Sequence, residues 1–224
     1  PYEKHIEEYC YTDLSKAFLM HAQREYGPQN AYLSYQLFNV SQPLAGQKIA
    51  AGAFDIVIAT NVLHATRNIR TTLRNAKATL RRNGLLLLNE LSDNVLFSHL
   101  TFGLLEGWWL YDDSTLRIPG SPGLYPKVWQ EVLQQEGFCE VVFPAEAAHR
   151  MGQQIIVGES DGVVRQATPY APPSQPTVLP APVLMPLPMN TTTNPDAIRG
   201  KARVYFSVLI GETIRIPASE ISAT

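Results

Sequence analysis

Residues 54–91 limit the choice of fold more than any other part of the sequence. Residues 54–63 are rich in Ile, Val and Ala, which predicts a strand buried on both faces. Residues 66–81 predict a helix, because apolar residues recur on one side at helical spacing. Residues 84–91 contain four consecutive leucines and predict another buried strand. We therefore expect both strands to be central and adjacent in one sheet.

The predicted helix over residues 66–81 has two different sides, and Asn83-Gly84 is expected to end it. Its apolar stripe should face the core, and four basic residues should lie on the opposite side. The stripe is Ile69, Leu73, Ala76 and Leu80, and the basic set is Arg70, Arg74, Lys77 and Arg81.

Strand-like and helix-like runs also alternate on either side of this unit. The alternation predicts an α/β fold with a mostly parallel sheet, helices on both faces and an antiparallel strand pair at the end. The further predicted strands are residues 8–12, 32–40, 138–145 and 153–160, and the further predicted helices are residues 13–26, 95–110 and 126–136.

The composition changes twice along the chain. Residues 1–166 carry the alternating pattern, and residues 167–195 hold nine of the 17 prolines with almost no charge. Such a stretch cannot form an apolar core and is typical of an extended linker. Residues 196–224 return to a helical pattern, so we expect a domain, a linker and the start of another domain.

Charge and cysteine content exclude several classes of function. A net charge of −2 gives no general attraction to nucleic acid or to an anionic membrane. The apolar runs have the length of strands and residues 1–5 lack a signal-peptide core, so we expect a cytoplasmic protein. Cys10 and Cys139 provide neither a disulfide framework nor the spacing of metal ligands, and no metal site is expected.

Two polar residues end the first two predicted strands. Ligands of open α/β sheets bind beyond the carboxyl ends of the strands, which makes such residues candidates for a binding site. Asp13 could bind a ribose hydroxyl, or it could cap the helix that follows. Asn39 could meet an adenine edge, or it could make a turn. The residues alone leave both alternatives open.

His64 and Glu90 follow the two central strands, so we expect them to lie near each other at one rim of the sheet. A carboxylate beside a histidine fixes the tautomer and stabilises the imidazolium, which is typical of a general base. The alternative is that His64 only caps the helix beginning near Thr66. The neighbouring histidine and aromatic side chains fit either a core or a pocket; they are His99, Phe102, Trp108, Trp109 and Tyr111.

The run Asn61-Val62-Leu63-His64-Ala65-Thr66 resembles the fourth-strand motif of C-methyltransferase domains in modular polyketide synthases of the trans-acyltransferase type. Residues 85–91, with Asn89-Glu90, resemble the strand that follows, and residues 103–110 resemble the next segment. The resemblance covers residues 1–166. It implies a class I methyltransferase fold with a Rossmann-like sheet.

In that family a histidine and a glutamate at these positions form the catalytic dyad. The resemblance therefore implies that His64 removes a proton with the help of Glu90. It also implies S-adenosylmethionine as cofactor, with its ribose held by Asp13 and its adenine beside Asn39. The other expected cofactor contacts are Leu14, Val40 and Asn61.

The implied reaction is methylation of the α-carbon of a β-ketoacyl thioester. Its substrate would be carried on the phosphopantetheine of an acyl carrier protein, and the expected partners are that carrier and neighbouring synthase domains. Residues 196–224 themselves resemble the opening helix and loop of an acyl carrier protein. The Asp-Ser-Leu or Asp-Ser-Ile site that carries phosphopantetheine does not appear before Thr224.

One part of the family pattern is absent from the sequence. The family's glycine-rich cofactor loop is expected roughly 20 residues before Asp13, whereas the first glycine is Gly27. We therefore expect this loop, the first strand and the first helix upstream of Pro1. The chain alone is expected to be impaired in cofactor binding.

Two other functions are open to such a sequence. A methyltransferase acting on oxygen or nitrogen of a diffusible molecule would have no use for residues 167–224. The other possibility is a non-catalytic structural remnant within a megasynthase. The absent loop agrees with this possibility, but the presence of both His64 and Glu90 is unexplained by it.

Overall fold

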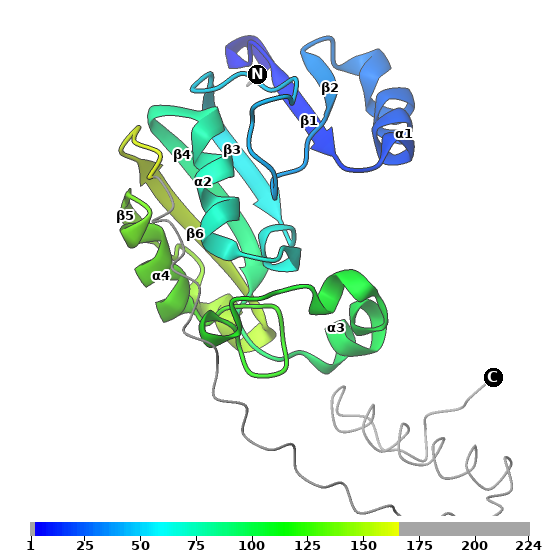
Figure 1. Cartoon of the computed structure of the whole chain (residues 1–224). Helices are drawn as coiled ribbons and strands as arrows, with labels where there is room; N and C mark the ends of the chain where they lie inside the picture. Colours follow the sequence, from blue (N-terminus) through cyan, green and yellow to red (C-terminus); the bar gives the residue numbers. More distant parts are fainter. Residues whose placement is uncertain (1–2, 166–224) are drawn as a thin grey trace, which may run out of the picture. The chain divides into compact units, whose positions relative to one another are not determined.

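The computed structural model describes residues 3–165, in which strands and helices alternate as the sequence predicts (Figure 1). The expected linker over residues 167–195 and the carrier-like residues 196–224 lie outside the described residues. The strands are β1 Tyr9–Asp13, β2 Leu33–Leu37, β3 Phe54–Thr60, β4 Leu80–Leu91, β5 Phe138–Val142 and β6 Gln153–Ser160. The helices are α1 Lys16–Tyr26, α2 Ile69–Thr79, α3 Leu96–Thr101 and α4 Pro126–Gln135.

The strands form two sheets. β1 and β2 pair in parallel, with Asp13 opposite Leu37. The larger sheet has the order β3-β4-β6-β5, in which β3 and β4 are parallel and β6 is antiparallel to both β4 and β5. The expected pairing of the two leucine- and isoleucine-rich strands is confirmed, and so is the antiparallel pair at the end.

Helices α2 and α4 pack against the larger sheet and share one core with it (Figure 1). Successive side chains of a strand point to opposite faces. Leu86 and Leu88 of β4 therefore share a face with Ile156 of β6, which lies opposite Leu88. These three side chains are at most 1% exposed and join Leu73 of α2 and Trp129 of α4. The apolar stripe predicted for α2 is buried as expected.

The prediction that β3 is buried on both faces is wrong. Ile56 and Ile58 are 51% and 57% exposed, whereas Val57 and Ala59 on the other face pack against the core. The reason is that α2 and α4 both belong to the core on the Val57 face, whereas α1 packs against β1 and β2. A segment rich in Ile and Val favours burial, but in this strand only one face is buried.

Two predicted helices are shorter in the structure. α2 ends at Thr79, because strand β4 already begins at Leu80. The helix predicted over residues 95–110 is α3 followed by two short turns, η4 Phe102–Leu104 and η5 Glu106–Trp109. Leu105 between these turns has extended backbone angles, and Gly103 and Gly107 weaken any continuous helix.

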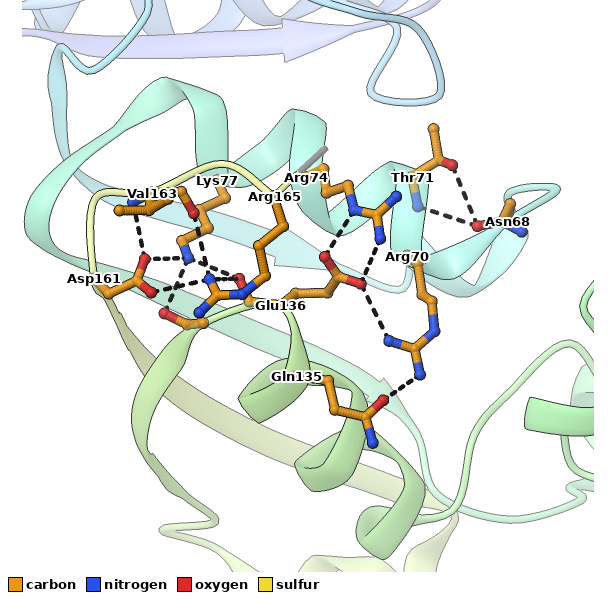
Figure 2. A network of polar contacts seen from close by, with 11 residues as sticks. Asn68, Arg70, Thr71, Arg74, Lys77, Gln135, Glu136, Asp161, Val163 and Arg165 are labelled. Carbon is orange, nitrogen blue, oxygen red and sulfur yellow. Dashed lines mark hydrogen bonds and ion pairs between the residues drawn. The ribbon is translucent and has the colours of Figure 1, made fainter. Parts of the chain in front are cut away.

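Lys77 is buried, which corrects the expectation that it lies on the polar side of α2. Its ammonium donates to the carbonyl oxygens of Glu136 and Gly137 at 2.7 and 2.9 Å and to the Asp161 carboxylate at 2.5 Å (Figure 2). Arg165 donates to the other Asp161 oxygen at 2.9 Å. Because a buried cation needs partners for all its donors, these contacts fix α2 to the segment that follows β6.

The Glu136 carboxylate adds a second tie to α2 in the same cluster (Figure 2). It is 2% exposed and accepts hydrogen bonds from Arg74 Nε at 2.7 Å and from Arg70 Nη1 at 3.1 Å. Two of the basic residues expected on the polar side of α2 are thus paired with the end of α4.

We expect Asp161→Asn to remove a part of the protein's stability that depends on pH. Burial raises the pKa of Asp161, but hydrogen bonds from Lys77, the Val163 N–H and Arg165 outweigh it and lower the pKa from 3.8 to about 2. The folded state therefore resists protonation of Asp161. This contribution is present above pH 3.8 and is lost as the pH falls towards 2.

Urea unfolding of the 224-residue chain measures this effect. The variant should unfold with about 2 kcal/mol less free energy than the natural chain at pH 6, and the difference should shrink towards pH 2. Asp55→Asn is the matched control, because Asp55 pairs with Arg81 at a position where both side chains are 62% exposed. An Asp161→Asn difference that stays constant over this pH range would contradict the assignment.

Candidate active site

His64 and Glu90 come together because β3 and β4 are parallel neighbours. Thr60 at the end of β3 lies opposite Asn89 of β4, so the residues that follow them meet at one edge of the sheet. Asn61 has a φ of 50°, a left-handed conformation that asparagine tolerates, and its N–H donates to the Asn89 carbonyl at 2.7 Å. The chain then enters the short turn η3, Leu63–Ala65, which carries His64.

The two candidate catalytic residues form a buried pair. His64 Nδ1 lies 2.5 Å from Glu90 Oε2, and the residues are 4% and 0% exposed. A carboxylate only accepts hydrogen bonds, so Nδ1 carries the proton and Nε2 is left as the basic nitrogen. The other Glu90 oxygen accepts the N–H of Leu63 at 2.9 Å. The predicted proximity of His64 and Glu90 is confirmed.

The alternative role of His64, as the cap of the following helix, is wrong. The residue before α2 is Asn68, and its side-chain oxygen accepts the Thr71 N–H at 3.1 Å. This is the contact that an N-cap residue makes. His64 lies one turn earlier, with its ring directed to Glu90.

The aromatic residues after α3 divide between core and surface. Trp108 is 5% exposed and meets the His64 ring edge-on, with 5.7 Å between ring centres. The His99 ring lies 5.6 Å from Trp108 on another side, whereas Trp109 and Phe102 are about half exposed, at 51% and 52%. Trp108 is therefore a core residue that packs directly against the candidate base. The sequence alone did not decide whether this side chain belongs to a core or to a pocket.

Arg117 and Asp113 belong to the site and were missed by the sequence analysis. Arg117 is 5% exposed, and its guanidinium donates to the main-chain carbonyls of His64 at 2.9 Å and of Thr66 at 3.0 Å. Asp113 accepts from Arg117 Nε at 2.5 Å and from the Ile69 N–H at 2.7 Å. No sequence signal identifies such contacts, because they end on main-chain atoms.

Asp13 and Asn39 both make turns at the carboxyl ends of their strands. Asp13 Oδ1 accepts the Ser15 N–H at 2.7 Å, and the N-cap position of α1 is Ser15, not Asp13. Asn39 Oδ1 accepts the Ser41 N–H at 3.0 Å, while the Asn39 N–H donates to the Gln47 side chain at 2.8 Å. Within residues 3–165, Asp13 Oδ2 and Asn39 Nδ2 make no hydrogen bond.

The other expected cofactor contacts lie beside these residues. Leu14 follows Asp13 and is 68% exposed. Val40 follows Asn39, and its carbonyl accepts a hydrogen bond from Asn75 of α2 at 2.9 Å. Asn61 is exposed at the end of β3.

Two searches of the described residues gave negative results. No group of three or more His, Cys, Asp or Glu residues in that part of the chain could hold a metal ion. None of the helices between residues 3 and 165 has the length and apolar character needed to cross a membrane.

Comparisons with known proteins agree with this geometry. Residues 2–86 match the family model for a methyltransferase domain. Polyketide synthase PksM of Bacillus subtilis (strain 168) is 52% identical over 231 residues, which cover all of this chain but 5% of that protein. The chain thus spans a small part of the curated relatives that it matches.

Solved structures give the same result at the level of the fold. The DszA carbon methyltransferase superposes with a TM-score of 0.67 and 39% identity, covering 73% of this chain and 43% of that one. The trans-methyltransferase CalH in complex with SAH gives a TM-score of 0.58 and 32% identity, covering 68% of this chain and 42% of that one.

The comparisons show that the described part has the class I methyltransferase fold. In sequence it is similar to part of proteins named polyketide synthases, and in structure to the DszA carbon methyltransferase and to the CMeT domain of the citrinin polyketide synthase. The fold class expected from the sequence is confirmed.

Proposed function

We propose that the chain is part of a methyltransferase that transfers the methyl group of S-adenosylmethionine to the α-carbon of a β-ketoacyl thioester. The observation that carries this proposal is the buried pair of His64 Nδ1 and Glu90 Oε2, 2.5 Å apart at the carboxyl edge of parallel strands. A base held in one tautomer suits removal of a proton from carbon. Its position agrees with the place where open α/β sheets bind ligands.

His64 supplies the base in this proposal. Its Nε2 takes the proton from the carbon between the two carbonyl groups, and the electron pair of the broken C–H bond passes into the enolate. Glu90 stabilises the imidazolium that forms, because its negative charge lies on the Nδ1 side of the ring. A positioned base contributes about 10²–10⁴ in rate. The cofactor, when bound, supplies an electrophilic methyl group on sulfonium sulfur.

The residues at the ends of β1 and β2 fit such a cofactor. A carboxylate accepts two hydroxyl groups and an amide NH₂ donates to ring nitrogens. Asp13 has one oxygen without a hydrogen bond and Asn39 has its Nδ2 without one, within residues 3–165. In our proposal Asp13 holds the ribose and Asn39 the adenine. Leu14, Val40 and Asn61 complete the cofactor contacts.

The domain layout and the partners belong to the same proposal. Residues 1–166 form the methyltransferase part, residues 167–195 a linker and residues 196–224 the start of a carrier-like domain. The substrate is then a thioester on the phosphopantetheine arm of an acyl carrier protein, in the cytoplasm. Similarity to proteins named polyketide synthases supports neighbouring synthase domains as partners.

Methyl transfer to a pair of matched substrates tests the proposed function. The protein for this assay is the chain together with the residues that its gene encodes directly before Pro1, called the extended chain below. With S-adenosylmethionine it should methylate an acetoacetyl thioester on a carrier protein, detected by mass spectrometry. It should leave the 2,2-dimethyl analogue unchanged, because that analogue has no proton on the carbon between the two carbonyl groups.

Two outcomes of this assay favour the other functions. An O-methyl enol ether as the product from the acetoacetyl thioester indicates transfer to oxygen. No methylation of either substrate, by an extended chain that binds the cofactor, indicates a non-catalytic remnant.

Asp13→Ala should weaken cofactor binding and spare the chemistry. Removing a carboxylate that holds two hydroxyl groups should raise the Kd for S-adenosylmethionine about tenfold or more in the extended chain, since a hydrogen bond to a charged group is worth about 1.5–3 kcal/mol. At saturating cofactor, kcat should stay within about twofold of the natural value. Calorimetry measures the Kd, and Glu7→Ala is a control at an exposed carboxylate. An unchanged Kd would remove Asp13 from the cofactor site.

A further inference from the structure

Arg117 donates hydrogen bonds to three main-chain carbonyls, two of them in the segment that carries His64. Nη1 donates to the carbonyl oxygens of His64 at 2.9 Å and Pro122 at 2.7 Å, and Nη2 donates to the Thr66 carbonyl at 3.0 Å. The side chain is 1% exposed and pairs with Asp113. A guanidinium has five fixed donors, so it can join several carbonyls that a smaller cation would not reach together.

These contacts hold one side of the turn that carries His64. The other side is held by Glu90, which accepts the Leu63 N–H at 2.9 Å through one oxygen and binds the His64 ring through the other. The turn η3 is only three residues long; no side chain caps its N-terminus, and the Thr66 hydroxyl at its C-terminus donates to the Leu63 carbonyl at 2.7 Å. Two buried charged groups tie the turn to other elements: Glu90 at the end of β4 and Arg117 in the loop before α4.

The charge of Arg117 is balanced locally. Asp113 accepts from Arg117 Nε at 2.5 Å and is 8% exposed at its side chain. The Arg117 charge is thus matched by that of Asp113, and the Glu90 carboxylate is the charged group in hydrogen-bond contact with the His64 ring.

We propose that Arg117 is a positioning residue for catalysis: it fixes the main chain of His64 so that the imidazole stays aligned with Glu90 and with the substrate carbon. This inference rests on the proposed function for its kinetic consequence, but the geometric consequence is independent of it. A displacement of about 1 Å in a catalytic group can cost about 10² in rate. Loss of the guanidinium should therefore reduce kcat more than it affects the binding of substrate or cofactor.

The kinetic test uses Arg117→Ala in the extended chain. We expect kcat to fall about 10²-fold, with little change in the KM values of cofactor and thioester. Guanidinium at millimolar concentration should recover about a tenth or more of the activity, because it can occupy the vacated site and bind the same carbonyls. Urea, a neutral molecule of similar shape, should not. Arg82→Ala, at an exposed arginine, should keep its activity and show no response to guanidinium.

A spectroscopic test needs no catalysis. The proton on His64 Nδ1 should give a low-field NMR signal from its short bond to Glu90 in the natural protein. Arg117→Ala should weaken or shift this signal, and guanidinium should restore it. If the natural protein makes no methylated product but this signal behaves as expected, the proposed function fails and the positioning role stands.

Arg117→Lys keeps the test decisive if the alanine variant does not fold. Lysine retains the charge but cannot bind three carbonyls in one plane, so an intermediate kcat and an intermediate NMR shift are expected. The inference is overturned if a folded variant keeps the natural kcat and the natural His64 signal. It is also overturned if a folded variant loses activity that guanidinium does not restore.

Discussion

His64→Ala is expected to lower methylation by the extended chain at least about 10²-fold at saturating cofactor. The variant lacks the proposed base, which is Nε2, the ring nitrogen left free by the bond to Glu90. Binding of S-adenosylmethionine should survive, since none of the proposed cofactor contacts is removed. Turnover by mass spectrometry and cofactor affinity by calorimetry separate these effects.

Stability needs its own control, because His64→Ala leaves a buried carboxylate without one partner. Breaking a buried pair can cost several kcal/mol. His64→Asn is the matched variant: its amide NH₂ can donate to Glu90 in place of Nδ1, yet it provides no base. We expect an unfolding free energy closer to that of the natural chain and activity as low as that of the alanine variant. A folded His64→Asn protein with undiminished turnover would show that His64 is structural only.

Glu90→Gln should slow turnover by about 10- to 100-fold, less than loss of the base itself, which contributes about 10²–10⁴. Glutamine keeps the size of the side chain but removes the charge that stabilises the imidazolium. One of its two terminal atoms becomes a donor, so the bonds to His64 Nδ1 and to the Leu63 N–H cannot both be kept. Turnover at saturating cofactor measures the effect.

Glu146→Gln is the control for this variant, because Glu146 is an exposed carboxylate. A small loss of stability is expected for Glu90→Gln, which a melting curve would record. Equal turnover for both variants would mean that the carboxylate only holds the turn.

The proximity of His64 and Glu90 could be predicted from the sequence. Both residues follow apolar strand-like runs joined by a helix, and parallel neighbours end at the same edge of a sheet. The inward side of α2 was predictable for a similar reason, since Ile69 and Leu73 recur at helical spacing.

The contacts of Arg117 and Lys77 could not be predicted. Arg117 binds carbonyls of residues 64, 66 and 122, and Lys77 binds carbonyls of residues 136 and 137. Every residue has a carbonyl, so no pattern of side chains marks these acceptors. Helical periodicity placed Lys77 on the polar side of α2. Its burial is possible because its ammonium donates hydrogen bonds to acceptors in segments distant in the sequence.

Burial of β3 was mispredicted because composition does not show which faces are covered. Ile56 and Ile58 have the apolar character of a central strand, and both are more than half exposed in the described part. The helix over residues 95–110 was mispredicted for a different reason. Apolar content suggested one helix, whereas Gly103 and Gly107 separate α3 from two short turns.

The position of the transferred methyl group tests the central claim most directly. The extended chain is supplied with S-adenosylmethionine labelled with carbon-13 in its methyl group and with a carrier-bound acetoacetyl thioester, and the released product is examined by NMR. The account predicts a labelled methyl bonded to the carbon between the two carbonyl groups, formed by the natural protein and absent with His64→Asn. A label on oxygen, or carbon methylation at an equal rate by both proteins, would contradict it.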